Sequence, residues 1–375
     1  MTPDLPSEKG RVSTLDSVRA VAVLGVIATH SLSATVAVTQ SYNIPQPLFK
    51  FFDFGQFGVQ VFFALSGWLI FSLYYRKPSP VSSKHYWARR IARIWPLWAL
   101  FVLLYFAIYD IDTSGLPTWW AIILSLLFIG WTVGTLVAVP TGGLTIQQEM
   151  GHYLLFWLFR KRGVDCFLLT VIVGYLSYFL AIELAGTFPD NSLLVDSVNG
   201  WLRLALFVSW PLFVLGGLSF LAFSTWRAHQ AAVALGDQRK LNIRPRTAML
   251  VLVAALLSTQ ILYSQETPSY FVFGFVVFSV LIGIALDHIP KVNAVFWSIG
   301  RYSYFMYFFH FLVLRQLENV YRNVFGTNPS ESGLWNLITL GSMFVASTAI
   351  SWLVAWVSWR IFESPILRTA RTKFK

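Results

Sequence analysis

The stretch "LDSVRAVAVLGVIATHS", residues 15–31, decides the fold class of this chain. Its apolar character continues to residue 38, which gives the roughly 20 residues that a bilayer-crossing helix needs. The segment nevertheless contains Asp16, Arg19 and His30, which a simple membrane anchor does not require. Ionisable groups are costly inside a bilayer and usually face a cavity or a partner. The stretch therefore predicts a membrane helix that also contributes to a functional site.

The composition of the chain extends this prediction to a polytopic membrane protein. Of the 375 residues, 56% are hydrophobic and only 12% are charged, whereas soluble domains carry about 25% charged residues. The net charge is +11, but the basic residues cluster in short loops between apolar runs, as membrane topology requires. We therefore expect membrane lipids as partners and no nucleic acid. The single cysteine, Cys166, excludes an internal disulfide and a cysteine-based metal site.

Eleven apolar segments are candidates for membrane crossings, and the positive-inside rule limits how many of them cross. With a cytoplasmic N-terminus, the basic connection 76–93 falls inside. The "RKR" at 160–162 then also falls inside, provided that 119–159 crosses only once. The segments lie near 15–38, 57–75, 92–110, 119–139, 143–159, 166–185, 201–223, 247–264, 270–286, 296–316 and 334–359.

We therefore expect an all-α membrane protein with about ten transmembrane helices, both termini in the cytoplasm and a re-entrant or irregular segment near 119–145. The expected outer loops carry only Lys50 and Arg322 as basic residues, which is the bias that the positive-inside rule predicts for this topology. No loop is long enough to bury a core of its own. The expected organisation is a cytoplasmic tail (1–14), a membrane-embedded domain (15–360) and a basic cytoplasmic tail (361–375).

Arg19 and His30 are separated by a spacing that places both on one face of the first helix. Eleven residues make three turns plus about 20°, and they separate the two side chains by about 16 Å along the axis. This arrangement suits one extended ligand, whose anionic part meets Arg19 while its reactive end reaches His30. The alternative is that His30 packs against another helix and Arg19 extends to the headgroups.

Three further segments carry polar groups inside apolar runs. Arg90 and Arg93, three residues apart, suit phosphate groups, although topology-setting charge is the ordinary explanation. In contrast, Ser66 and Gly67 in "GVQVFFALSGWLIF" (58–71) indicate close helix packing and no chemistry. The polar residues of the other two segments are Gln147, Gln148, Glu149 and His152 in 142–159, and Tyr302, Ser303, Tyr307 and His310 in 300–313.

His310 is expected at about the same membrane depth as His30, because it lies about 20 Å above the start of its helix. Glu149 is expected within a turn or two of this level, which predicts one buried site. Glu149 and His152, at i and i+3, could instead pair with each other. A Glu-x-x-His pair ligates metal in some helical bundles. A second such pair is missing from this sequence, so we expect no metal site.

With these residues, the chain resembles the membrane acyltransferase 3 family, whose members O-acetylate cell-surface sugars and related acceptors. Two departures are "LTIQQE" at 144–149, where the family has WSLxxE, and Phe309, where many members have tryptophan. The matching elements, in the family's order, are Leu15–Asp16 with Arg19-x10-His30, "FFALSGWLI" at 62–70, Arg90-x-x-Arg93 followed by Ile94 and Pro96, "SYFMYFFH" at 303–310 and "FESP" at 362–365.

The resemblance implies an O-acyltransferase that moves an acyl group, acetyl first, from cytoplasmic acyl-coenzyme A to a hydroxyl of a cell-envelope carbohydrate or similar acceptor. Acyl-coenzyme A is then a co-substrate, and no bound cofactor is expected. The catalytic candidates are His30, Glu149 and His310; Arg19, Arg90 and Arg93 are candidates for the phosphates; and Asp16, Tyr302, Ser303 and Tyr307 are candidates for contacts with the acceptor or for supporting roles.

Two other classes of function are compatible with midplane histidines and carboxylates. A proton-coupled transporter or flippase of a lipid-linked intermediate also uses such groups, but it usually has internal repeats, and this sequence has no second Arg-x10-His. A catalytically silent membrane scaffold would not need the buried charges. The sequence leaves the acceptor, the acyl group and the oligomeric state open.

Overall fold

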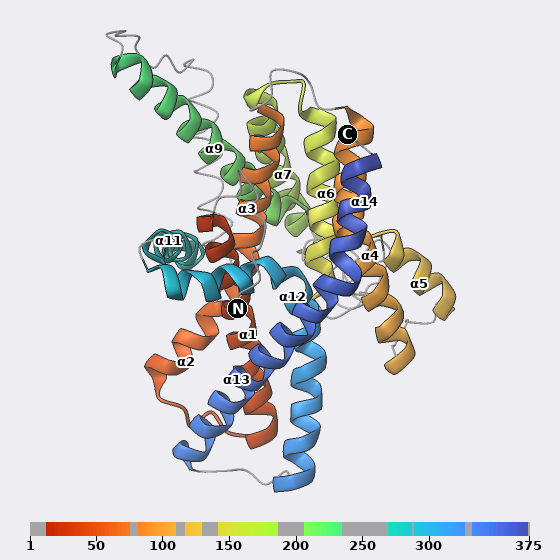
Figure 1. Ribbon diagram of the computed structural model, residues 1–375, viewed down its shortest axis with the longest axis vertical. Helices are drawn as coiled ribbons and strands as arrows, with labels where there is room; N and C mark the ends of the chain where they lie inside the picture. The colour runs from red at the N-terminus through yellow and green to blue at the C-terminus, as the bar shows by residue number, and fades with distance from the viewer. Residues whose placement is uncertain are drawn as a thin grey trace. The chain divides into compact units, whose positions relative to one another are not determined.

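The computed structural model describes residues 13–75, 82–109, 117–129, 142–186, 206–234, 269–286, 289–326 and 332–373. Every regular element within these ranges is a helix, and none is a strand, which confirms the all-α fold class. The helices are coloured along the chain in Figure 1. The chain divides into two compact units: unit 1 contains Met1–Val61 and Val272–Trp356, and unit 2 contains Phe62–Phe271 and Val357–Lys375.

Unit 1 is built around two long helices, α1 and α12, that pack against each other. A small hydrophobic cluster joins this pair to α13. In it, Ala34 and Val38 of α1 contact Leu314 of α12 and Met343 of α13. The helices of this unit are α1 (Ser13–Thr39), α2 (Gln46–Asp53), a 3₁₀ turn (Phe54–Phe57), the start of α3 (Gly58–Tyr75), most of α11 (Ser269–Leu286), α12 (Pro290–Phe325) and most of α13 (Gly333–Ser358).

Three buried hydroxyl groups of helix α1 find their partners within the helix. Ser31 donates to the carbonyl of Ile27 at 2.7 Å, Thr35 to that of Ser31 at 2.8 Å and Thr39 to that of Thr35 at 2.9 Å. A hydroxyl buried without a partner would cost free energy, and these i−4 bonds remove that cost. Asp16 and Arg19 carry charge, so bonds of this kind to the backbone do not account for their presence in α1.

Unit 2 contains the remaining helices, several of which begin at recognisable signals. The Ser82 side chain caps α4 by accepting from the backbone N–H of His85 at 3.2 Å. Gly142 precedes α6 with a positive φ of 78°, a conformation that glycine adopts without strain. The helices are the rest of α3, α4 (Ser83–Ile108), α5 (Thr118–Leu126), α6 (Gly143–Phe159), α7 (Val164–Gly186), α9 (Leu206–Ala234), a π-helical turn (Trp359–Glu363) and α14 (Ser364–Lys373).

Four helical stretches within the described ranges are long and apolar enough to cross a membrane: Thr14–Thr39, Gln46–Tyr75, Ser83–Ile108 and Gly333–Ala370. The total of ten crossings and the sidedness of the termini stay predictions, and the segment 247–264 lies outside the described residues. Helix α5 has nine residues and is about 14 Å long, which is too short for a hydrocarbon core of roughly 30 Å.

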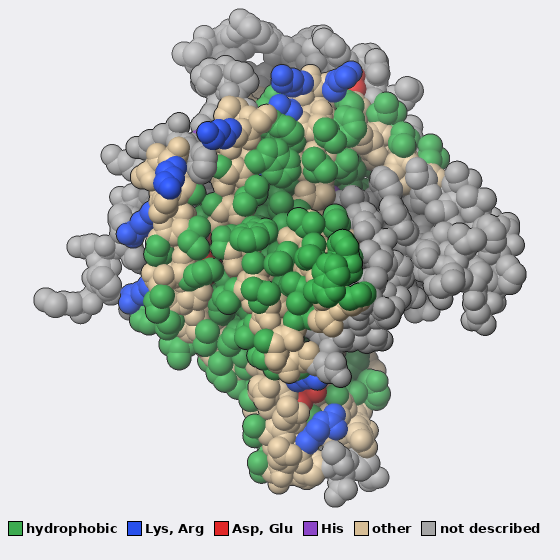
Figure 2. Space-filling view, turned by 90° about the vertical axis from the view of Figure 1, so that its right-hand side faces the viewer, with side chains coloured by type: hydrophobic (Ala, Val, Ile, Leu, Met, Phe, Trp, Pro, Cys, Tyr) green, Lys and Arg blue, Asp and Glu red, His purple; other side chains and the backbone are tan. Residues whose placement is uncertain are grey.

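The outward-facing side chains of these helices are largely aliphatic. Leu103 on α4, Leu176 on α7 and Val345 on α13 are all more than half exposed. Figure 2 shows a face over which hydrophobic side chains dominate. Large contiguous apolar surfaces are rare on soluble monomers, so these faces are suited to lipid. The long apolar helices and their exposed aliphatic residues identify a membrane protein.

Candidate active site

Unit 1 brings His30 of α1 and His310 of α12 side by side. The ring centroids lie 5.4 Å apart with an interplanar angle of 37°. Phe311 contacts both rings, at 4.5 Å from His30 and 4.1 Å from His310. His310 is fully buried, whereas His30 is partly exposed. The two histidines, which are 280 residues apart in the sequence, thus form one pair at one depth of the helix bundle.

The hydrogen bond of His310 shows which ring nitrogen carries a proton. Nδ1 lies 3.0 Å from the backbone carbonyl of Met306, which only accepts, so Nδ1 carries the proton in a neutral ring. Nε2 then holds the lone pair. It has no hydrogen-bond partner within the described part of the chain. A buried acceptor without a partner is costly in an apolar interior, and it marks His310 as a group that a substrate hydroxyl could meet.

The register between α1 and α12 is what places these histidines together. Gly300 of α12 lies against the backbone carbonyl of Asp16, where a Cβ atom would collide with it. The Ser17 hydroxyl donates to the Asn293 side-chain oxygen at 2.7 Å. These contacts lie about three to five turns from the histidine pair and bring the two helices close together there. A glycine in α12 therefore sets the geometry of a site that it does not touch.

Arg19 has a charge partner on its own helix. Its Nη1 donates to the Asp16 carboxylate at 3.0 Å, and the two side chains are only 12% and 1% exposed. A buried ion pair with good geometry lowers the cost of placing an arginine inside a membrane domain. Because α1 is continuous from Ser13 to Thr39, Arg19 and His30 lie on one helix at the expected spacing of eleven residues.

Unit 2 contains a second polar centre, which we call the Glu149 network: Ser66, Glu149, Tyr153 and Arg90. The Ser66 hydroxyl donates to Oε1 of Glu149 at 2.6 Å, and the Tyr153 hydroxyl donates to the same oxygen. The Arg90 guanidinium lies over the Tyr153 ring, 5.0 Å from its centroid. Helices α3 and α6 thus meet at one carboxyl group, and α4 contacts its tyrosine partner through Arg90. The assignment of Ser66 to packing alone missed this contact.

The neighbouring glycine does act as a packing residue, as expected from the sequence. A Cβ on Gly67 would collide with the backbone carbonyl of Phe213 on α9. Ser66 and Gly67 therefore serve different purposes on the same helix. A serine one residue from a packing glycine gives no sequence signal for a carboxyl partner 83 residues away, so only the structure reveals it.

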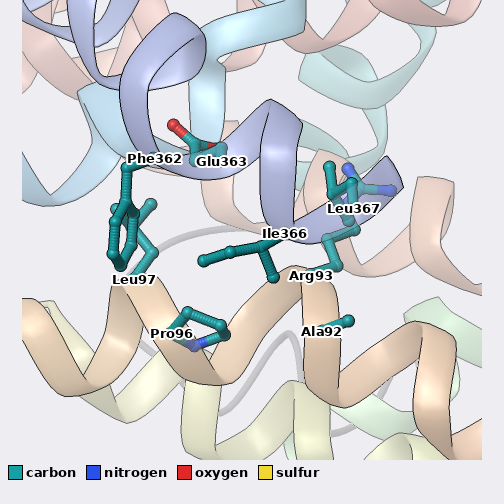
Figure 3. A pocket seen from close by; sticks show the side chains of 8 residues that line it. All are labelled: Ala92, Arg93, Pro96, Leu97, Phe362, Glu363, Ile366 and Leu367. Atoms are coloured by element: carbon teal, nitrogen blue, oxygen red, sulfur yellow. The ribbon is translucent and has the colours of Figure 1, made fainter. Parts of the chain in front are cut away.

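Arg90 and Arg93 have different surroundings, although they are three residues apart. Arg90 is partly buried between the rings of Tyr153 and Tyr86, at 5.0 Å and 5.6 Å from their centroids. Arg93 is exposed, and Figure 3 shows it reaching from α4 to Leu367 on α14. The sequence suggested that these arginines could bind phosphate as a pair, with topology-setting charge as the ordinary alternative. The structure separates an arginine within an aromatic cage from one at an inter-helix surface.

His152 and Glu149 each form a hydrogen bond to a residue of another helix. The His152 Nε2 lies 3.0 Å from the Ser209 hydroxyl of α9, and both residues are buried. The rings of Phe63, Trp210 and Phe213 surround the imidazole at centroid distances of 5.1 to 5.6 Å. This pair is a polar tether between α6 and α9.

The other predicted site residues of α12 precede His310 along the helix. Tyr307 is buried, with its ring centroid 6.2 Å from that of His310. Ser303 is buried one turn further toward the start of the helix, and Tyr302 beside it is partly buried. Tyr307 thus shares the surroundings of the histidine pair, whereas Tyr302 and Ser303 lie two turns from His310.

A small hollow between α4 and the C-terminal helix is too small to hold a substrate. It is lined by Arg93, Pro96 and Leu97 of α4 and by Phe362 and Ile366 (Figure 3). Its volume of about 10 Å³ admits about one water molecule. The hollow is therefore a packing gap. Among the described residues, no group of three or more histidine, cysteine or acidic side chains has the arrangement of a metal site.

Comparison with known proteins gives one match. A family described as an acyltransferase domain matches residues 12–356, nearly the whole chain. This span contains His30, Glu149 and His310, together with the three arginines that the sequence singled out. A search of curated proteins and a search of solved structures each find no match to the chain.

Proposed function

The chain belongs to the acyltransferase 3 family, and from this we propose that it moves a short acyl group, acetyl first, from cytoplasmic acyl-coenzyme A to a hydroxyl of a cell-envelope carbohydrate or similar acceptor. That it is a membrane acyltransferase in general follows from the family and from its apolar helices. The donor, the acceptor and the bacterial cytoplasmic membrane are the proposed parts, and so are the ten crossings with both termini inside.

The observation that carries the proposal is the histidine pair. An imidazole has an unperturbed pKa of roughly 6.5, so it is suited to accept and return a proton near neutral pH. His30 is partly exposed and lies 5.4 Å, centroid to centroid, from a second imidazole.

In the proposed reaction His30 acts as the general base. It removes the proton of the acceptor hydroxyl while that oxygen forms a bond to the thioester carbon. The carbon–sulfur bond then breaks, and the proton passes from His30 to the departing coenzyme A thiolate. The alternative is that His30 attacks first and carries the acyl group as an acyl-imidazole until the hydroxyl takes it. Both routes balance without any further reactant.

The remaining candidates are assigned to binding and positioning. Arg19, Arg90 and Arg93 are proposed to hold the anionic donor, with Arg19 held in place by Asp16. His310 and Tyr307 are proposed to meet the acceptor hydroxyl beside His30, and Tyr302 and Ser303 to line its approach. Glu149 is proposed to contribute its carboxyl group, which Ser66 and Tyr153 orient.

The test is acyl transfer by the purified protein in lipid nanodiscs with radiolabelled acetyl-coenzyme A and an extract of envelope glycans. Label in the glycan fraction that disappears with His30→Ala supports the proposal. Movement of an unmodified lipid-linked substrate without label transfer would replace it with transport. A single-turnover experiment without acceptor separates the two routes, because only the acyl-imidazole route releases one equivalent of coenzyme A thiol.

A further inference from the structure

Helix α13 carries two buried polar atoms that no part of the proposed reaction uses. Asn336 and Thr339 lie one turn apart on this helix, and both are 0% exposed. The side-chain oxygen of Asn336 and the hydroxyl oxygen of Thr339 have no hydrogen-bond partner among the residues that the structure describes. Burying such atoms without a partner is costly. Two of them on adjacent turns are therefore suited to receive the hydroxyl groups of a ligand.

A turn of the chain fixes the orientation of the Asn336 amide. Its Nδ2 donates to the Ser41 hydroxyl at 3.1 Å and to the backbone carbonyl of Asn43 at 3.2 Å. Because a carbonyl only accepts, the amide nitrogen faces the turn and the amide oxygen is directed away from it. That oxygen offers an acceptor, and the Thr339 hydroxyl can donate or accept. Neither side chain carries a charge, which favours a neutral, hydroxyl-rich ligand over an anionic headgroup.

The two residues lie beyond the histidine pair, toward the end of unit 1 that the expected topology places outside. Met343 follows Thr339 by one turn of α13. It packs against Ala34 of α1 and Leu314 of α12, which lie one turn beyond the two histidines. At 1.5 Å per residue, Thr339 is about 12 Å and Asn336 about 17 Å from the histidine level. A monosaccharide held at the histidines does not span this distance, whereas an oligosaccharide does.

The turn that holds Asn336 also presents an aromatic ring. Tyr42 lies between Ser41 and Asn43 and is 72% exposed. The next residue, Ile44, is buried in a hydrophobic cluster with Leu340 of α13, which anchors the turn. An exposed tyrosine ring has an apolar face and a polar hydroxyl. This combination suits the apolar face and the hydroxyl groups of a sugar ring.

We propose that Asn336 and Thr339 bind hydroxyl groups of a sugar that neighbours the acylated one, so that the acceptor is an oligosaccharide or a polysaccharide. The inference rests on the proposed function and deepens it, because it names the class of acceptor that the sequence left open. Tyr42 stacks on the sugar at the entrance. Both polar atoms are covered in this state, so the turn at 41–43 moves as the sugar enters. The glycan then passes Met343, whose unbranched side chain adapts its rotamer.

The experiment measures binding to the full-length protein in nanodiscs by isothermal titration calorimetry, without acyl donor. The probes are the monosaccharide and oligosaccharide fractions of hydrolysed envelope glycan, and the wild type is expected to prefer the oligosaccharides. Thr339→Val keeps the shape of the side chain and should weaken oligosaccharide binding about fivefold, as one neutral hydrogen bond implies. Its thermal midpoint should not fall, because the substitution removes an unpaired hydroxyl from the interior. A purely structural role for Thr339 predicts unchanged binding.

Ser351→Ala is the matched control on the same helix. It removes another buried hydroxyl that has no partner in the described part of the chain, and Ser351 lies on the opposite side of the histidine level from Thr339. This variant should bind oligosaccharides as the wild type does. Tyr42→Ala should weaken that binding, and Tyr42→Trp should retain it.

Equal affinity of the wild type for the two fractions would overturn the inference, and so would unchanged oligosaccharide affinity in Thr339→Val. An equal loss in Ser351→Ala would also overturn it, because the effect would then belong to any buried hydroxyl of α13. Binding that depends on Thr339 without transfer of label from acetyl-coenzyme A would remove the proposed function. Transfer to monosaccharides as fast as to oligosaccharides would remove only this inference.

Discussion

In unit 1 the rings of His30 and His310 face each other and Phe311, whereas in unit 2 the Glu149 carboxyl group accepts from the hydroxyls of Ser66 and Tyr153. The first region leaves Nε2 of a buried imidazole without a partner among the described residues. The second places two donors on one carboxyl oxygen. A group kept without a partner is suited to receive a substrate, while a group with fixed donors is suited to hold its own position.

The largest expected effect comes from removing the imidazole of His30. His30→Ala and His30→Gln should each lower the rate of acetyl transfer by about 10²- to 10⁴-fold, the usual contribution of a general base. Transfer of label from acetyl-coenzyme A to glycan in nanodiscs is the measurement, and an unchanged thermal midpoint is the control for folding. If His30→Gln transfers at the wild-type rate, the distinction between a reactive and a structural region fails.

Substitutions in the Glu149 network are expected to lower the thermal stability and to shift the position of the Glu149 carboxyl group. Ser66→Ala and Tyr153→Phe each remove one hydrogen bond to Glu149, which should cost about 1.5 to 3 kcal/mol if the carboxyl group is charged. The measurement is the thermal unfolding midpoint in detergent, with Tyr74→Phe as the matched variant on α3, because the structure records only ring contacts for Tyr74. Midpoints equal to that of Tyr74→Phe would show that the network is not formed.

A substitution far from the histidines should disturb them through helix register. Gly300→Ala places a Cβ against the Asp16 carbonyl, and such overpacking typically costs about 1 to 3 kcal/mol. Gly341→Ala on α13 meets no atom within 4 Å and should be neutral or stabilise its helix by up to about 1 kcal/mol. Thermal midpoints and transfer rates of the two variants test this. Equal behaviour would mean that α1 and α12 are not held at Gly300.

The smallest effect concerns a carboxyl group outside both regions. Burial raises the pKa of Glu318 above its usual 4.5, although Arg322 and Arg315 act in the opposite direction. The folded state therefore binds this proton more tightly than the unfolded state, so stability falls as the pH rises through the folded pKa. Glu318→Gln should flatten that part of the stability profile and slightly raise the thermal midpoint at neutral pH. A profile with the wild-type slope would contradict the raised pKa.

Much of the candidate site follows from helix geometry that the sequence already contains. The interval between Arg19 and His30 depends only on residues per turn and rise per residue. The prediction that His30 and His310 share one depth came from the expected starts of their helices, whereas their contact depends on the register that Gly300 and Ser17 hold. The contacts of Ser66, Tyr153 and α14 do not follow, because they join residues from different helices, and helical periodicity carries no information on which helices meet or how they are rotated.

The sequence by itself determined that this protein is an all-helical membrane protein with ionisable groups at fixed heights, because apolar length and helical rise are local properties. The tertiary structure alone decided that Arg90 lies between two tyrosine rings while Arg93 reaches the C-terminal helix. It also decided that Glu149 bonds to Ser66 instead of His152. The physical reason is that close helix packing depends on shape at particular residues, such as Gly67 and Gly300.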